Sequence, residues 1–385
     1  MRVLFLNYEY PPLGGGAANA TEYLLKEYAK DSSLQVDLVT SSPTTERQEM
    51  WLGDSICVHA LPIGKNGSNL HHQSQKDLLV YSWHAYWYAK KLLETNQYDV
   101  IHAFFGVPCG VLAMRLGKKF GVPYIVSLRG ADVPGYSERF SFLYTILTPL
   151  IQRVWRQAFQ VIANSQGLKE LALRSLPKQE IGIIPNGVDT TRFSPNQEVV
   201  AEDEWIITAG ATRLTARKGL HLIIEALPAL LGTNPEVVFE IMGDGASEER
   251  LRQRAAELGI SQQVRFLGRV PSTETNAYYQ RAKVFVLPSA NEGMSNALLE
   301  ALASGLPAVV TDTGGSSELV TERVNGFIIA RETEAIAKAL EYLLTHEEER
   351  KLMGHASRTR AEAQSWQAVA EAYKKVYEEA IVQKV

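Results

Sequence analysis

Two glutamates with seven residues between them, Glu292 and Glu300, are the side chains best spaced for chemistry in this chain of 385 residues. The run 284–289 (VFVLPS) before them is short, apolar and partly β-branched, so we expect a buried strand there. The run after Ser295 has apolar residues at helical spacing and predicts a helix. One carboxylate therefore falls in a strand-to-helix turn and the other in the first turns of the helix.

The start of this predicted helix is a candidate anion site between the two carboxylates. The first N–H groups of a helix have no partner within it and carry partial positive charge, which suits a phosphate. Carboxylates on both sides of a phosphate site fit a ligand with hydroxyls at both ends and phosphate in the middle. A nucleotide sugar is such a ligand.

Two cations, Arg213 and Lys218, lie in the loop 210–219 (GATRLTARKG), which follows a strand-like run and opens a helix. They could neutralise a diphosphate and stabilise it as a leaving group, the part that Mg²⁺ takes in other enzymes. The alternative is a solvated basic loop, and Arg217 is the cation that we expect in solvent. A Walker A motif is not present, because the Gly-Lys pair is reversed in Lys218-Gly219.

Flexible turns follow several other predicted strands. Three consecutive glycines, Gly15 and Gly16 among them, come after the first strand, where they either face a sugar or phosphate or form a plain tight turn. Their spacing does not match the dinucleotide-binding pattern of glycines. Gly243 ends a second strand and Arg269 and Val270 follow a third, where backbone groups could contact a nucleobase.

The sequence offers few candidate residues for metal binding or for catalysis by histidine. The chain has no Asp-x-Asp pair, so the carboxylate clamp of metal-dependent nucleotide-sugar enzymes is missing, and we expect no metal and no cofactor. The adjacent pair His71-His72 is interpreted as surface, since no cysteine or carboxylate stands at ligand spacing. His102 ends the run 99–105 and either points near the ligand or is a buried, hydrogen-bonded histidine.

Composition is that of an ordinary globular protein, with 45% hydrophobic and 21% charged residues. A formal net charge of -4 argues against a nucleic-acid partner, whose binding surface would be basic. Two cysteines, Cys57 and Cys109, give no disulfide framework. The first apolar run, 3–6, is too short for a signal peptide, and no run approaches the roughly 20 residues of a transmembrane helix. We therefore expect a cytoplasmic protein.

Strand-like and helix-like segments alternate along the whole chain, which predicts an α/β protein with parallel sheets. The expected strands are 3–7, 35–41, 99–105, 123–129, 160–165 and 181–185, then 205–209, 237–242, 264–267, 284–287, 308–311 and 327–329. Residues 43–73 are polar and irregular and predict a hairpin or an excursion over one face. The stretch 186–203 is rich in Pro, Asn and Asp and predicts a linker between two doubly wound halves. Ligands of such sheets bind at the carboxyl ends of strands, which favours a site in a cleft between the halves.

Two amphipathic segments have two interpretations each. The tail from about residue 365 either crosses back to the first half or packs only on the second. The segment 139–159 mixes apolar residues with Arg139, Arg153 and Arg156, and either lies on a membrane surface or faces the core with a charged back.

These motifs together resemble the retaining glycosyltransferases of family 4. The resemblance covers nearly the whole chain, and the pattern around Glu292 and Glu300 (PS…EG…LEA…GLP, 288–307) is its most specific part. It also includes the loop 8–16 (YEYPPLGGG), the segment 184–189 (IPNGVD), the Arg213/Lys218 pair and the tail. It implies a GT-B fold of two facing Rossmann-like domains: an acceptor-binding domain at 1–186, a donor-binding domain at 187–364, and a final helix at 365–385.

The resemblance also implies roles for single residues. Arg213 and Lys218 are expected to bind the donor diphosphate and Glu292 the donor sugar. Glu300 is expected to hold the ribose hydroxyls. The segment from Met294 through Ser295 to Asn296 is expected to present backbone amides to sugar and phosphate.

The chain departs from the family pattern at the expected acceptor side. Relatives often carry His-Gly-x-Asp after the fourth strand, whereas this chain has Arg129 in place of that histidine and keeps Asp132. A second common histidine, two places after His102, is Phe104. Arginine cannot act as a base near neutral pH, so Arg129 is expected to stabilise charge or bind an acceptor phosphate.

The function predicted from the sequence is transfer of a sugar, with retention and without metal, from a UDP- or GDP-linked donor to a hydroxyl of a glycan or lipid-linked glycan. Contact with the inner face of the membrane is part of this expectation. Two alternatives stay open: a nucleotide-sugar epimerase of the same fold, and a non-catalytic nucleotide-sugar-binding protein.

Overall fold

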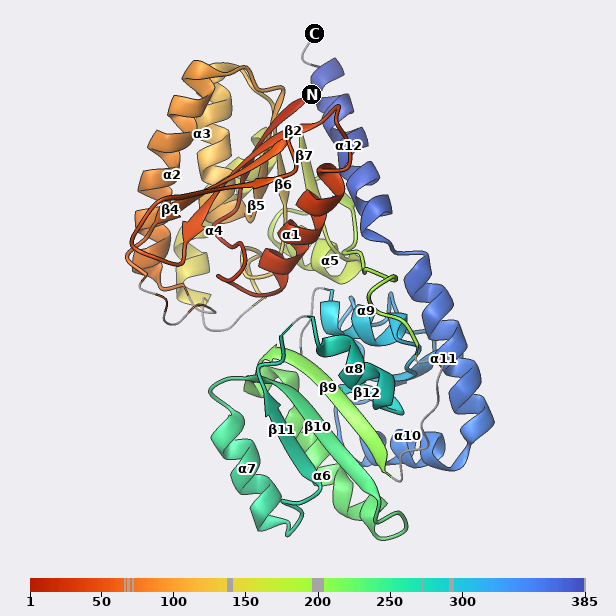
Figure 1. Ribbon diagram of the computed structural model, residues 1–385. Helices are drawn as coiled ribbons and strands as arrows, with labels where there is room; N and C mark the ends of the chain where they lie inside the picture. The colour runs from red at the N-terminus through yellow and green to blue at the C-terminus, as the bar shows by residue number, and fades with distance from the viewer. Residues whose placement is uncertain are drawn as a thin grey trace. The chain divides into compact units, whose positions relative to one another are not determined.

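The computed structural model describes residues 1–65, 67, 70, 73–136, 141–195, 204–271, 273–290 and 294–383. The chain forms two compact units (Figure 1). Unit 1 contains Met1–Asn186 and Trp366–Val385, and unit 2 contains Gly187–Ser365. The alternation of strands and helices expected from the sequence is present in both.

Unit 1 is built on an eight-stranded sheet in the order β3-β4-β2-β1-β5-β6-β7-β8, in which β3 alone is antiparallel to its neighbour. The strands are β1 (Arg2–Leu6), β2 (Gln35–Ser42), β3 (Gln48–Leu52), β4 (Ile56–Pro62), β5 (Val100–Phe104), β6 (Tyr124–Ser127), β7 (Gln160–Ala163) and β8 (Ile181–Ile183). The helices are α1 (Gly16–Tyr28), α2 (Gln75–Thr95), η1 (Gly106–Gly110), α3 (Val111–Phe120), α4 (Ser141–Gln157), α5 (Gln166–Ser175) and α12 (Trp366–Val382). Figure 1 shows α2 and α3 on one side of this sheet and α1 with α12 on the other.

Unit 2 has a six-stranded, fully parallel sheet in the order β11-β10-β9-β12-β13-β14. Its strands are β9 (Trp205–Arg213), β10 (Val237–Asp244), β11 (Val264–Gly268), β12 (Val284–Leu287), β13 (Ala308–Thr311) and β14 (Gly326–Ile329). Its helices are η3 (Ala216–Lys218), α6 (Leu220–Leu231), α7 (Glu248–Glu257), α8 (Thr275–Arg281), α9 (Asn296–Ala303), α10 (Thr333–Thr345) and α11 (Glu347–Glu362). The four residues of β12 are fully buried, as expected for a central parallel strand covered on both faces.

The hairpin expected within residues 43–73 exists, but it does not lie over a face of the sheet. β4 pairs with β2 in parallel and is therefore the third strand of the sheet counted from β1. Its pattern is hard to recognise because His59 interrupts the apolar run. That histidine is buried against Asp37 of β2, a partner that only the folded chain supplies.

The predicted linker is largely part of unit 2. Val188 forms a bridge with Ser365, and Phe193 is almost fully buried among residues of α8 and α9. Arg358 of α11 donates to the carbonyl oxygens of Phe193 (2.7 Å) and Thr190 (3.0 Å). The segment up to residue 195 is therefore packed rather than loose, and 196–203 lie outside the described residues.

The two amphipathic segments both supply core residues to unit 1. α12 packs against α1, where Tyr28 and Tyr377 share a hydrogen bond of 2.8 Å and Trp366 stacks on Tyr23 at 5.4 Å between ring centroids. In α4, Val154 and Trp155 are fully buried. Within the described part of the chain, no helix combines the length and apolar character needed to span a bilayer.

Candidate active site

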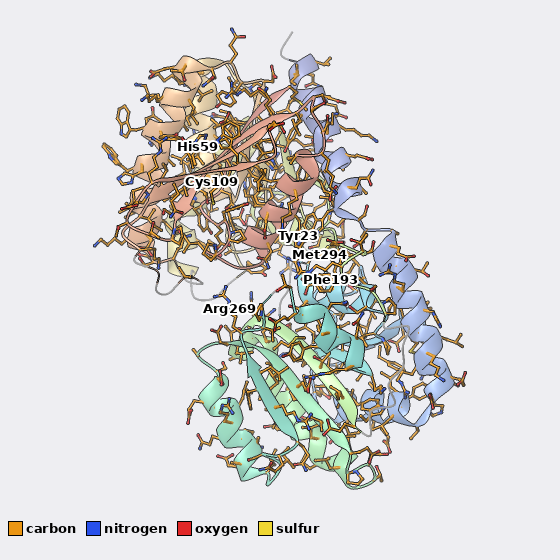
Figure 2. The ribbon with its side chains drawn as sticks, viewed as in Figure 1. Tyr23, His59, Cys109, Phe193, Arg269 and Met294 are labelled. Atoms are coloured by element: carbon orange, nitrogen blue, oxygen red, sulfur yellow. The ribbon has the colours of Figure 1, made fainter. Side chains whose placement is uncertain are left out.

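The predicted donor residues of unit 2 follow the carboxyl ends of four parallel strands, which share one edge of the sheet. Lys218 follows β9, Gly243 lies near the end of β10, and Arg269 and Val270 follow β11. Met294 precedes α9, which follows β12. Arg269 and Met294, from the ends of two different strands, lie at the same end of unit 2 in Figure 2. Parallel pairing thus brings together residues that are far apart in the sequence.

The turn that carries Lys218 packs directly on the loop after β12. Gly219 has a φ of +70°, and a Cβ atom there would stand 2.2 Å from the carbonyl oxygen of Pro288, so this position requires glycine. The amide of Ala290 donates to the carbonyl oxygen of Arg217 at 2.8 Å. The cationic turn is therefore fastened to the segment that leads into the glutamate motif.

Two predicted catalytic groups fall outside the described part. The backbone of Arg213 ends β9, opposite Asp244 of β10, but its side chain is not described. Glu292 belongs to residues 291–293, which lie outside the described residues together with His71 and His72. Lys218 is described and partly buried.

The start of α9 is capped by a serine side chain. Ser295 is the N-cap residue, and its hydroxyl accepts the amide of Leu298 at 3.3 Å. Met294 is buried before the cap and Asn296 is the first helical residue. The helix start carries partial positive charge and is fixed at the edge where the strands end.

Glu300 lies one turn further along α9, in contact with α8. The hydroxyl of Tyr279, on α8, donates to Glu300 Oε2 at 3.3 Å. Burial raises the pKa of Glu300 to about 7, against the opposing influence of the Arg192 charge and the Tyr279 hydrogen bond. Gly210 of β9 makes room for this arrangement, because a Cβ there would stand 2.4 Å from the Tyr279 hydroxyl.

Tyr279 and Arg192 did not emerge from the sequence as site residues. Tyr279 lies in a seven-residue helix without a recognisable motif, and Arg192 lies in the stretch that we interpreted as linker. Their nearness to Glu300 depends on how α8 and the segment before β9 pack on α9, which no local pattern encodes.

The glycine turn of unit 1 follows β1. Gly15 precedes α1 and its amide donates to Glu9 Oε2 at 3.3 Å, while Gly16 is the first residue of α1. Gly14 has a φ of +100°, so the turn uses the conformational freedom of glycine.

His102 is not directed toward the carboxyl edge of the sheet; it is the buried, hydrogen-bonded histidine of the alternative interpretation. Its side chain is fully buried, with Nδ1 at 2.7 Å from the Tyr377 hydroxyl and Nε2 at 2.8 Å from the Ser127 hydroxyl. Burial, and to a smaller extent the charge of Arg129, lowers the pKa of His102 well below its usual value. It is thus a neutral part of the core.

Arg129, at the position of the family's histidine, binds two parts of unit 1. Its Nη1 donates to Asn186 Oδ1 at 2.9 Å and its Nη2 to the Tyr373 hydroxyl of α12 at 3.2 Å. The guanidinium lies 3.5 Å from the centroid of the Phe104 ring. The two positions where relatives carry histidine are therefore in direct contact, as a cation on an aromatic face.

Asp132 holds the loop after β6. Its carboxylate accepts the amides of Gly106 (2.7 Å), Arg129 (2.9 Å) and Gly130 (3.0 Å). Burial raises the pKa of Asp132, and these amide hydrogen bonds oppose that rise. The residue joins the end of β6 to the turn after β5.

Sequence comparison matches the two units to two family descriptions. Residues 14–192 match "Glycosyltransferase Family 4" and residues 191–360 match "Glycosyl transferases group 1". A GDP-mannose-dependent alpha-(1-6)-phosphatidylinositol monomannoside mannosyltransferase of Mycobacterium tuberculosis is 30% identical over 71% of this chain and 74% of its own length. The putative teichuronic acid biosynthesis glycosyltransferase TuaC of Bacillus subtilis is 30% identical over 63% of this chain and 60% of its own length.

Solved structures share the fold over the full length. Sucrose-phosphate synthase from Thermosynechococcus elongatus matches with a TM-score of 0.86 and 20% identity, covering 100% of both chains. Anabaena Alr3699/HepE in complex with UDP and glucose matches with a TM-score of 0.76 and 19% identity, covering 98% of this chain and 99% of the other. This chain therefore belongs to glycosyltransferase family 4 and has the GT-B fold of two Rossmann-like domains.

Proposed function

We propose that the protein transfers a hexose from a nucleoside-diphosphate sugar to a hydroxyl acceptor, with retention at the anomeric carbon and without a metal or cofactor. The observation that carries the proposal is the contact between the Lys218 turn and the loop leading to α9, made by the Ala290–Arg217 hydrogen bond and the packing of Gly219 on Pro288. This contact supports the proposal because it joins a turn that carries a cation to the loop leading into α9, and a cation together with a helix start is suited to a diphosphate.

Each group has a distinct part in this mechanism. Lys218 and Arg213 stabilise the charge that develops on the leaving diphosphate, and the amides of Ser295 and Asn296 at the start of α9 share it. Glu300 accepts hydrogen bonds from the ribose hydroxyls, and Glu292 contacts the donor sugar. Gly243, Arg269 and Val270 border the base. The acceptor hydroxyl then attacks the face from which the diphosphate leaves.

Unit 1 binds the acceptor in this proposal. Gly15 and Gly16 are assigned to the sugar or phosphate of the donor, and Asp132 fixes the loop after β6. Arg129 acts through Asn186 and α12 rather than as a base. UDP as the donor nucleotide is supported by the complexes of the Anabaena protein, and GDP by the name of the Mycobacterium relative.

The acceptor is a glycan or lipid-linked glycan, as the names of the polysaccharide- and phosphatidylinositol-related relatives suggest. The protein then works in the cytoplasm, with unit 1 in contact with the membrane surface. No nucleic acid takes part. In α4, the segment that the sequence offered for this contact, Val154 and Trp155 are buried in the core and Ile146 is 60% exposed.

The test is incubation with labelled UDP- and GDP-sugars and candidate glycan acceptors. The proposal is supported if label appears on an acceptor and NMR shows that the product has the same anomeric configuration as the donor. A changed sugar on the nucleotide would indicate an epimerase, and binding without turnover a non-catalytic protein.

Substitution of Lys218 makes this test specific to the proposed site. We expect Lys218→Ala to lower kcat by about 10²–10³-fold, the cost of removing one preorganised group that stabilises transition-state charge. Arg217→Ala, which removes the neighbouring cation of the same turn, half-buried like Lys218 but given no part in the mechanism, is the matched control and should keep most activity. Equal rates for Lys218→Ala and the unaltered protein, at equal thermal midpoints, would contradict the proposed site.

A further inference from the structure

Three polar side chains converge on one nitrogen, Nδ1 of His59 on β4, next to the edge strand β3 of the unit 1 sheet. His59 is labelled in Figure 2. Glu49 Oε1 lies 3.1 Å away, the Tyr88 hydroxyl 3.0 Å and Cys57 Sγ 3.8 Å. The Tyr88 hydroxyl is also 3.3 Å from Glu49 Oε1. Strand register causes this meeting, because Glu49 is paired with His59 across β3 and β4, and Cys57 points to the same face two residues earlier.

The other nitrogen of His59 is held by a carboxylate. Nε2 lies 2.9 Å from Asp37 Oδ1, while Asp37 Oδ2 accepts hydrogen bonds from Tyr98 (2.7 Å) and Arg2 (2.9 Å). A carboxylate on the far nitrogen is the usual support of a metal-bound histidine, since it fixes the proton there and leaves a lone pair on the near nitrogen. That lone pair faces both the Tyr88 hydroxyl and Glu49 Oε1, so a cation bound there would meet a nitrogen and two oxygen ligands.

The separations centred on His59 Nδ1 are compatible with a small tetrahedral cation. Zinc bonds of about 2.0 Å to nitrogen or oxygen and about 2.3 Å to sulfur place neighbouring ligand atoms roughly 3.3–3.6 Å apart. The four separations above, from 3.0 to 3.8 Å, bracket this range. Sulfur, imidazole and carboxylate together form a donor set that zinc accepts.

We propose that Cys57, His59 and Glu49 bind one Zn²⁺, with the Tyr88 hydroxyl in the fourth position. Binding replaces the thiol proton of Cys57, which leaves to solvent. The side chain of Glu49 is 45% exposed, which gives the ion a path from solvent. Arg47, which contacts Glu49 at 2.5 Å and is itself half exposed, turns away when the ion enters.

The ion would tie the edge of the sheet to a helix. Glu49 lies on β3, Cys57 and His59 on β4, and Tyr88 on α2, so one site joins the edge hairpin to its covering helix. None of the proposed substrate-binding residues lies on these elements. The inference is therefore independent of the proposed transfer reaction, and the metal has a structural part.

The experiment uses the full chain, stripped with a chelator and titrated with Zn²⁺. We expect one zinc per chain by elemental analysis and a rise of several degrees in the thermal midpoint at saturating zinc, because an ion that binds the native state stabilises it. Co²⁺ in place of zinc should give a thiolate-to-cobalt charge-transfer absorption. Cys57→Ser should abolish that absorption, and Glu49→Gln, at a half-exposed position that the fold tolerates, should weaken zinc binding at least tenfold.

The controls separate this site from other zinc ligands. Cys109→Ser replaces the other buried cysteine, which lies near the Tyr81 hydroxyl and outside the cluster, and should leave zinc binding unchanged. Zinc uptake that survives Cys57→Ser but is lost on replacement of His71 and His72 by alanine would assign the ion to that pair and overturn the proposal. So would a stripped protein that takes up no zinc at all.

Discussion

The protonation state of Glu300 affects both the stability of the fold and the proposed binding of the donor. Its pKa is raised to about 7 by burial, against 4.5 for an ordinary glutamate, while its proposed ligands are hydroxyl groups that need an ionised acceptor. The empty protein and the donor complex therefore favour different protonation states of the same carboxyl group.

A pH series tests this residue directly. Between pH 4.5 and 7 the folded state binds a proton that the unfolded state does not, so the stability of the nucleotide-free protein should fall as pH rises through this window. Glu300→Gln should remove that slope, and donor affinity should rise over the same window in the unaltered protein alone. Thermal midpoints and donor titrations measure both. Parallel midpoint curves for the unaltered protein and Glu300→Gln would contradict the assignment. Glu347→Gln, at an exposed position on α11, is the control.

Arg129 and Phe104 stand where relatives often have histidines, and the structure explains them as a pair. The guanidinium lies on the Phe104 ring and donates hydrogen bonds to Asn186 and Tyr373. Arg129 therefore connects α12 and the segment at Asn186 to the ends of β5 and β6. A histidine at 129 could not reach both partners, because its side chain is shorter than that of arginine and lacks the forked guanidinium.

At the scale of elements, α2 presents an unusual outer surface. Leu79, Trp83 and Trp87, four residues apart, are 72%, 65% and 48% exposed. Two exposed lysines, Lys76 and Lys91, come before and after them on the helix. Large apolar side chains with lysines are typical of helices that lie in a membrane interface. α2 is therefore the surface of unit 1 best suited to the proposed membrane contact.

Vesicle binding tests this surface. We expect the protein to sediment with phosphatidylglycerol vesicles more than with phosphatidylcholine vesicles, since lysines favour an anionic surface. The double change Trp83→Ala and Trp87→Ala should weaken binding by roughly tenfold or more, from the apolar area lost. Leu352→Ala, an exposed apolar position on α11, serves as the control. Undiminished sedimentation of the double variant would exclude α2 as the contact.

At the scale of the whole molecule, the last helix completes the first domain. Trp366, Val369, Tyr373 and Tyr377 belong to the core of unit 1, although 179 residues of unit 2 precede them in the chain. The Tyr377 hydroxyl is hydrogen-bonded to both Tyr28 and His102. Unit 1 is therefore incomplete until the end of the chain has been made.

Truncation tests this dependence. A chain that ends at Ser365 should lose the calorimetric unfolding transition of unit 1, or become insoluble, because it exposes an apolar face and leaves His102 without a partner on Nδ1. Unit 2 should keep its own transition. Removal of residues 383–385 alone, beyond α12, is the control. An unchanged transition of unit 1 without α12 would show that the helix is dispensable.

The alternation of strand and helix along this chain was enough to predict the α/β class and most strand positions, because period and turn chemistry are local properties. The family was predicted from a resemblance, which the motif around Glu292 and Glu300 carries most specifically. The glutamate spacing and the Arg213/Lys218 loop likewise marked the candidate site. Tertiary structure alone decided that β4 enters the sheet, that His102 is a core residue and that Tyr279 reaches Glu300. Each of these depends on a partner distant in sequence, such as Asp37 for His59, and the free energy of burying a polar group depends on that partner.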